Sequence, residues 1–204
     1  MTAAVRIAAV ILAGGGASRL GGVDKARVLV GGVPLLARVA ERVGRQAETV
    51  AVAVPQGGAI HVRPGMAVIR DTLAPPGGPL GGLAAAGVWA GKAVGPDALV
   101  LSAPVDTPFF PEDFASRAAA LFDPEIDAVA GSHSGQVYPL CALWRVSALC
   151  RLPAHLAANP DDRRVFGFLD TLNWRPLACE APPGNPFANA NNVGDLVALS
   201  GRVR

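Results

Sequence analysis

The chain has 204 residues, of which 51% are hydrophobic and 17% charged, so it can bury one core and is not disordered. Its net charge is only +2, and no dense Lys/Arg run or aromatic interleaving suggests a nucleic-acid partner. No segment reaches the ~20 apolar residues that a membrane span needs. We therefore expect a single domain spanning residues 1–204, with neither a nucleic acid nor a membrane as partner.

The three cysteines, Cys141, Cys150 and Cys179, have neither the paired spacing of a metal site nor the even number of a disulfide framework. They favour a reducing, cytoplasmic setting. The apolar run after Arg6 has only the minimum length of a signal-peptide core, and it flows into a loop with chemistry of its own.

The first predicted strand, Ile7 to Ala13, is continuously apolar and ends in three glycines, which is typical of a strand buried on both faces. A glycine loop brings backbone amides close to an anion. Ser18, Arg19 and Lys25 add a hydroxyl and two positive charges, so the stretch is a candidate phosphate cradle. The alternative is a tight strand-to-helix turn with surface charges. The sequence fits neither the dinucleotide fingerprint nor the P-loop.

The next segments alternate between helical and strand patterns. A helix is expected over residues 34–46, a strand over 49–54, and a further strand ending at 68–71. A loop rich in glycine and proline follows, and it includes Asp71, Gly78 and Pro79. A helix is expected from Leu83 to Ala90, and its N-terminus would suit polar ligand groups. The alternative is an ordinary strand–loop–helix crossover.

A central strand over residues 97–103 leads to Asp106. Open α/β sheets bind ligands at the carboxyl ends of their strands, and Mg²⁺ prefers carboxylate oxygens. Asp106 is therefore a candidate metal ligand facing a triphosphate. The alternative role, capping a helix that starts near Pro111, is less favoured because a cap normally lies directly before its helix.

The second half is less regular. Strands are expected over residues 126–130 and 136–144, joined by the loop 131–135 as an antiparallel edge. Helices are expected over 146–158 and 161–172, and a last strand over 174–179. His133 is expected to be a solvated loop histidine.

Two further groups of side chains are candidates for binding a polar ligand. Arg163 and Arg164 can grip a phosphate, although a solvated helix start explains them equally well. Asn189 and Asn191 alternate and should face the same side of an extended segment, with simple turn chemistry as the alternative. Asn192 is expected to cap the final helix.

The pattern Leu-Ala-Gly-Gly-x-x-Ser-Arg-Leu-Gly-x-x-Asp-Lys, ending at Lys25, resembles the signature of nucleotidyltransferases. Its Gly-Gly-Val-Asp-Lys ending and the tail Phe187-Ala-Asn-Ala-Asn-Asn resemble the molybdenum cofactor guanylyltransferase family. Three positions depart from that family: Val105 for cysteine, Tyr138-Pro139 for His-Pro, and Asn192 for threonine. The tyrosine puts any imidazole role at its position in doubt.

The resemblance implies a three-layer α/β/α sandwich, with a Rossmann-like, mostly parallel sheet and an antiparallel edge. It implies a GTP-binding half at about residues 1–110 and an acceptor-binding half at about 111–204. The implied reaction transfers GMP from GTP to molybdopterin in the presence of Mg²⁺. The resemblance also allows a docking partner from cofactor biosynthesis or a molybdoenzyme chaperone.

The resemblance assigns roles to individual residues. The catalytic residues would be Lys25, Arg19 and Asp106, with Asp106 as metal ligand. The GTP-binding set would be Leu12, Ala13, Gly14, Gly15, Ser18, Lys25, Asp71, Gly78, Pro79 and Asp106. The acceptor-binding set would be Arg163, Arg164, Asn189 and Asn191. Three alternatives stay open: cytidylyl transfer, nucleotidyl transfer to a sugar phosphate, and a non-catalytic nucleotide-binding module.

Overall fold

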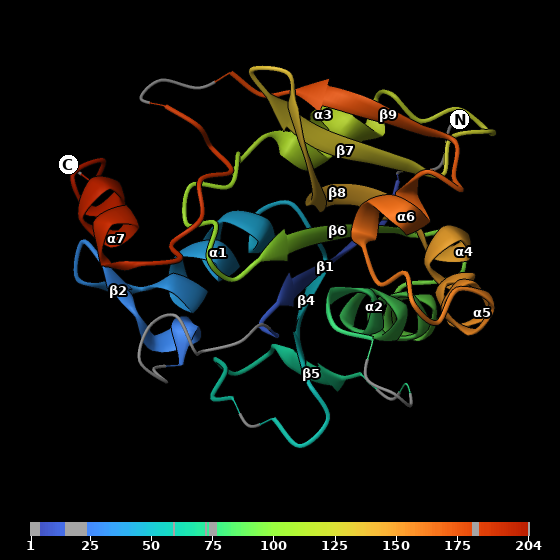
Figure 1. Cartoon of the computed structure of the whole chain (residues 1–204), viewed down its shortest axis with the longest axis horizontal. Coiled ribbons are helices and arrows are strands. Elements are labelled where there is room, and N and C mark those ends of the chain that lie inside the picture. Colours follow the sequence, from blue (N-terminus) through green and yellow to red (C-terminus); the bar gives the residue numbers. More distant parts are fainter. Residues whose placement is uncertain are drawn as a thin grey trace.

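A computed structural model describes residues 5–14, 24–58, 60–71, 73, 77–180 and 184–203. A seven-stranded sheet in the order β5-β4-β1-β6-β8-β7-β9 organises it, and the strands follow one another in this order across Figure 1. The strand bounds are β1 Ile7–Leu12, β4 Thr49–Val54, β5 Ala67–Arg70, β6 Leu99–Pro104, β7 Ala128–His133, β8 Gln136–Arg145 and β9 Trp174–Ala178. A separate two-stranded hairpin joins β2 Leu29–Val30 to β3 Val33–Pro34.

The expected α/β class is confirmed: β8 alone runs antiparallel to its neighbours in the large sheet. The antiparallel strand is not outermost, because β7 and β9 lie beyond it. β7 includes His133, so the β7–β8 turn is shorter than the expected loop of residues 131–135. A register shift of β8 against β7 after Ala130 allows Leu140 to leave the regular ladder.

Side chains of β1 alternate between two cores, which explains why its whole run is apolar. Ala8 and Val10 belong to the core under α2 Pro79–Ala93, α4 Val146–Leu149, α5 Leu152–Ala158 and α6 Val165–Leu169. Ala9 and Ile11 belong to the core under α1 Leu35–Gly44 and α3 Phe114–Ala119. The sheet is therefore covered on both faces, as in a three-layer sandwich.

Three helices differ from their predicted bounds. α2 starts at Pro79, four residues early, because proline suits a first helical turn and the preceding Gly78 supplies φ +60°. The helix expected over 146–158 is two helices, since Pro153 has no N–H with which to continue the ladder. α6 starts only at Val165, after the Asp162 carboxylate has bonded the Arg164 N–H at 3.0 Å.

The last helix, α7 Val193–Ser200, lies beside β2 and apart from the large sheet (Figure 1). Asn192 caps it as expected. Together with η2, a 3₁₀ turn over Lys25–Arg27, it completes the regular elements of the described residues. No helix among these residues is both long and apolar enough to cross a membrane.

Candidate active site

The carboxyl ends of β1 and β6 lie side by side and set the position of the site. In this parallel pair Leu12 lies opposite Pro104. The backbone continues the pairing one step further, because the Val105 N–H donates to the Leu12 carbonyl at 3.1 Å. The glycine loop and the loop that carries Asp106 therefore leave the sheet together.

Lys25 and Asp106 meet in front of this edge. The Lys25 Nζ atom donates to Asp106 Oδ2 at 2.8 Å, and the two side chains are only 17% and 14% exposed. Lys25 opens η2, where Asp24 is the cap and accepts the Ala26 N–H. Asp106 precedes Asp113, the cap residue of α3, by a full loop. It caps no described helix, so the capping role is wrong, while its role as a metal ligand stays a prediction.

The C-terminal tail crosses the same edge. Asn191 Oδ1 accepts a second hydrogen bond from Lys25 Nζ at 2.8 Å. The Ala190 N–H donates to the Asp106 carbonyl at 3.0 Å, while the Ala190 side chain is buried on the other side. Asn189 and Asn191 thus flank a buried residue on the site side of an extended segment, as their alternation predicted.

A cavity of about 400 Å³ opens over the Lys25–Asp106 pair, within the range of small-molecule sites. Its wall includes residues from the ends of β1 and β6, from the Lys25 turn and from the C-terminal tail, together with residues from other loops. The lining residues are Leu12, Ala13, Gly14, Asp24, Lys25, Ala26, Pro55, Pro79, Pro104, Val105, Asp106, Leu140 and Asn189. Beside it lies a smaller chamber of about 180 Å³, which shares Gly14 and Pro79 and adds Asp71 and Gly78. The chamber is lined by apolar residues, glycines and Asp71, whereas the larger cavity holds the Lys25–Asp106 ion pair, so the two spaces differ in polarity.

Asp71 shapes the second loop. It is 4% exposed, and its two oxygens accept the N–H groups of Leu73 at 2.9 Å and Gly77 at 2.7 Å. A side chain on Gly81 would overlap this carboxylate, so glycine is required there. Asp71 lies at the chamber, but both its oxygens are already bonded to backbone.

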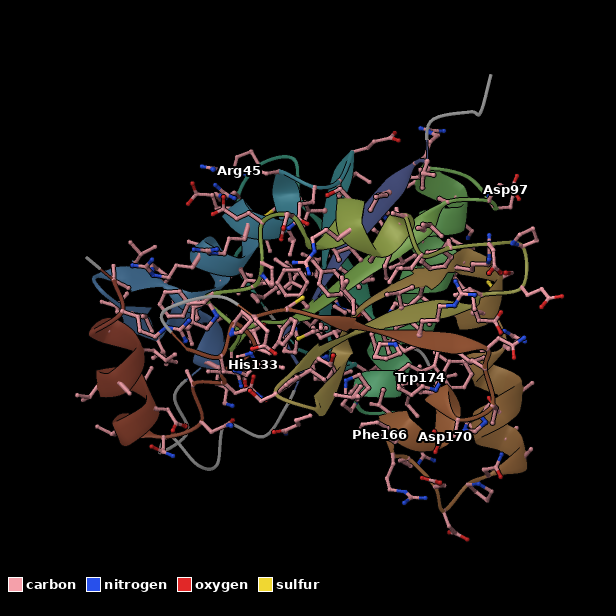
Figure 2. All side chains as sticks on the ribbon, turned by 90° about the horizontal axis from the view of Figure 1, so that it is seen from above. Arg45, Asp97, His133, Phe166, Asp170 and Trp174 are labelled. Carbon is pink, nitrogen blue, oxygen red and sulfur yellow. The ribbon has the colours of Figure 1, made fainter. Side chains whose placement is uncertain are left out.

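The structure does not place every predicted site residue at this cavity. Gly15, Ser18 and Arg19 lie outside the described residues. Arg163 and Arg164 do not line the cavity, and Arg164 forms a two-point ion pair with Asp162 at 3.0 and 2.8 Å. Figure 2 shows Phe166, on the helix α6 that follows them, and Asp170, directly after that helix, at the periphery and away from His133.

Two further polar side chains of the second half serve other contacts. His133 is not a solvated loop residue: its ring is 18% exposed, and Nδ1 donates to the Cys179 carbonyl at 2.9 Å. The Tyr138 hydroxyl accepts from the Asn185 amide at 2.6 Å, and its ring packs on Phe187. Neither lines the cavity.

Leu140 is a cavity residue that the sequence did not indicate. The buried Ser102 hydroxyl donates to the Leu140 carbonyl at 2.8 Å and accepts from Trp144 Nε1 at 2.8 Å. Next to it, burial raises the pKa of the Cys141 thiol well above its usual value, and the nearby Asp106 charge adds to this. Cys141 is therefore held as a thiol and offers no nucleophile.

The side chains at the cavity include few oxygen ligands for a divalent cation. Among the described residues no three metal-ligating side chains cluster. Two carboxylates of the described residues, Asp24 and Asp106, lie on the cavity wall, and Asp106 keeps an oxygen, Oδ1, that has no hydrogen-bond partner among those residues. Mg²⁺ is commonly held by one or two carboxylates with substrate phosphates and water, so these residues fit it.

Comparison with known proteins assigns the class. Residues 9–172 match the MobA-like NTP transferase domain. Among solved structures, a molybdopterin-guanine dinucleotide biosynthesis protein A from Archaeoglobus fulgidus superposes with TM-score 0.75 at 23% identity, over 96% of this chain and 97% of that one. A Mycobacterium tuberculosis protein in complex with manganese gives TM-score 0.65 at 14% identity, over 98% and 100%. The chain is thus a nucleotidyltransferase of the MobA-like class.

Relatives of higher sequence identity identify the family within this class. A molybdenum cofactor guanylyltransferase from Cereibacter sphaeroides is 42% identical over 200 residues, which is 98% of each chain. One from Acidiphilium cryptum is 40% identical over 190 residues, 93% of this chain and 92% of that one. The chain belongs to the molybdenum cofactor guanylyltransferase family.

Proposed function

We propose that the protein transfers GMP from GTP to molybdopterin and releases pyrophosphate. The observation that carries the proposal is the Lys25–Asp106 pair inside the cavity at the ends of β1 and β6, in a chain that is 42% identical to a guanylyltransferase. An oxygen of the acceptor's terminal phosphate attacks the α-phosphorus. The new P–O bond forms as the bond to the β-phosphate oxygen breaks, and pyrophosphate leaves with that electron pair.

Positioning and charge neutralisation drive such a transfer, and no protein nucleophile is needed. We assign the small chamber beside Gly78 and Pro79 to the guanine base and the larger cavity to the phosphates. Backbone groups of Leu12, Ala13 and Gly14 would contact the base, as the family resemblance implies. Lys25, and Arg19 from the undescribed loop, would neutralise charge on the leaving pyrophosphate. Gly15 and Ser18 would bind phosphate.

Asp106 would hold Mg²⁺, which when bound supplies positive charge among the triphosphate oxygens. The fold neighbour in complex with manganese supports a divalent cation in this fold. Asp71 would act by shaping the loop at the base. Asn189 and Asn191 would contact the acceptor; Arg163 and Arg164 would have to leave their present contacts to do so. We place the enzyme in the cytoplasm, supported by three unpaired cysteines, with docking to a cofactor-biosynthesis protein or molybdoenzyme chaperone.

The direct test is incubation with GTP, Mg²⁺ and molybdopterin. We expect pyrophosphate release and formation of the guanine dinucleotide, with GTP preferred over CTP, ATP and UTP in calorimetric binding. Preference for CTP would assign a cytidylyltransferase. GTP binding without release above a no-enzyme control would indicate a nucleotide-binding module.

A further inference from the structure

Helix α7 is attached to the molecule by a small core of its own. This core comprises the buried residues Val30, Leu35, Ala190 and Leu199, outside the two cores of the large sheet. The helix contributes no residue to the cavity wall. Its first turn, however, adjoins Asn191, whose side chain reaches into the site.

The carboxylate of Asp195 connects the helix to that residue. Asp195 Oδ2 accepts the backbone N–H of Asn191 at 2.8 Å and that of Asn192 at 3.1 Å. Hydrogen bonds to a charged acceptor are stronger than neutral ones. The Asn191 backbone is therefore fixed in place by the first turn of α7.

Asn191 in turn fixes Lys25, which lies 166 positions away in the chain. An ammonium group has three N–H donors. Two of those on Lys25 go to Asn191 Oδ1 and Asp106 Oδ2, each at 2.8 Å. Among the described residues nothing accepts the third, so it is available to a phosphate oxygen in the cavity.

We propose that Asp195 is a positioning residue for nucleotide binding, acting through Asn191 to hold the Lys25 ammonium ready for a phosphate. The inference rests on the proposed function for the identity of the nucleotide. It assigns α7 a role in the reaction although the helix touches no reacting atom. Preorganised donors of this kind avoid reorganisation when the ligand binds.

The competing explanation is that Asp195 only stabilises the start of α7. The capping box provides a matched control, because its second bond runs from the Asp195 N–H to Asn192 Oδ1 at 2.9 Å. Asp195→Ala and Asn192→Ala each remove one half of the box. Only Asp195→Ala releases the Asn191 N–H.

The measurement is calorimetric binding of Mg·GTP and of Mg·pyrophosphate, with melting temperatures recorded for each variant. We expect Asp195→Ala to weaken the binding of Mg·GTP and of Mg·pyrophosphate by about 5- to 10-fold each, the scale of coupling within one hydrogen-bond network. Asn192→Ala should change both less than twofold at a similar melting temperature. Asp195→Asn, which keeps an acceptor oxygen, should recover part of the affinity.

A double-mutant cycle separates positioning from stability. In an Asn191→Ala background, Asp195→Ala should have little further effect on affinity, because its route to Lys25 is already cut. Equal losses from Asp195→Ala and Asn192→Ala, or a full additional loss in the Asn191→Ala background, would overturn the proposal. If Asp195→Ala fails to fold, Asp195→Asn carries the comparison with a smaller expected loss, which must still exceed that of Asn192→Ala and vanish in the Asn191→Ala background.

The binding measurements need no acceptor, so they stand even if guanylyl transfer is not observed. A wild-type protein that binds Mg·pyrophosphate but prefers another nucleotide would refute the assigned substrate and leave the positioning role testable. A protein that binds neither GTP nor pyrophosphate would overturn both.

Discussion

Two regions of different construction meet at the candidate site. The carboxyl edge of β1, β4 and β6 is fixed by backbone ladders, and its register places Leu12 beside Pro104 without help from side chains. The tail over residues 184–203 crosses that edge and is held by side-chain contacts, by the small core around Leu199 and, among the described residues, by a single backbone bond from Ala190 to Asp106 rather than by a ladder. The sheet fixes the position of Asp106. The tail, through Asn191, fixes the position of the Lys25 ammonium group that faces it.

The difference predicts where substitutions act. A change at the sheet edge should remove chemistry or reshape the cavity, because the surrounding backbone cannot relax far. A change in the tail should alter affinity more mildly, because the elements it joins remain folded.

Asp106→Asn should have the largest effect. The amide keeps the size of the side chain and an oxygen toward Lys25, but it loses the charge that a divalent cation needs. We expect turnover in the pyrophosphate-release assay to fall by about 100-fold or more, the scale of losing one key electrostatic contact. The melting temperature should change little.

Asp113→Asn is the control, since Asp113 is an exposed carboxylate at the cap position of α3, paired with Arg117 of the same helix. It should leave turnover unchanged. Extra Mg²⁺ or Mn²⁺ should partly restore Asp106→Asn. Wild-type turnover of folded Asp106→Asn at limiting Mg²⁺ would contradict the metal-ligand role.

Gly81→Ala should deform the second loop. The new methyl group would overlap the buried Asp71 carboxylate, which holds the Gly77 N–H. Overpacking of this kind costs roughly 1–3 kcal/mol, so we expect GTP affinity to fall about tenfold as the loop moves.

Gly91→Ala in the same helix is the matched control, because its methyl group would meet only Val146 Cγ1 at 3.4 Å. It should keep GTP affinity and gain some helix stability. Calorimetry on the two variants measures the difference. Equal affinities would show that Asp71 does not shape the nucleotide site.

Ser102→Ala tests the wall that β8 contributes. It would leave the fully buried Trp144 Nε1 without its acceptor and would free the Leu140 carbonyl. An unsatisfied buried donor costs about 1–3 kcal/mol, measurable as a loss of unfolding free energy in urea. Ser116→Ala removes an exposed hydroxyl bonded to the Asp113 carbonyl and should stay within about 0.5 kcal/mol. Similar values for the two would contradict a structural role of this network.

Most of the fold was predictable because it follows from local patterns. The apolar runs at residues 7–13, 49–54 and 97–103 all became parallel strands, and the ends of parallel strands meet by topology. That rule, together with the preference of Mg²⁺ for carboxylate oxygens, indicated Asp106. Helix bounds were less accurate where a single residue interrupts or delays a helix. Pro153 divides the helix expected over 146–158, and Asp162 delays the start of α6.

The remaining parts of the site depend on contacts between distant segments. The alternation of Asn189 and Asn191 indicated which side they face, but no pattern indicated Lys25 as the partner of Asn191. Leu140 reaches the cavity through a register shift that has no sequence signature. His133 appeared solvated because its contact, the Cys179 carbonyl, lies directly after a distant strand, β9.

The smallest expected effect on GTP binding is that of Arg164→Ala. The same residue tests whether the segment around Arg164 binds the acceptor or only forms a surface ion pair. The Arg164 guanidinium and backbone N–H hold the pKa of Asp162 at about 2, below its ordinary 3.8. A lowered carboxylate pKa means that the folded state favours the ionised form. Its contribution to stability is therefore present above pH 3.8 and is lost as the pH falls through about 2.

Arg164→Ala should return the Asp162 pKa toward 3.8 in an NMR titration, while GTP affinity stays unchanged. If molybdopterin draws Arg164 away, the wild-type pKa of Asp162 should rise when that acceptor is added. A pKa that stays near 2 with saturating acceptor would remove Arg164 from the acceptor site.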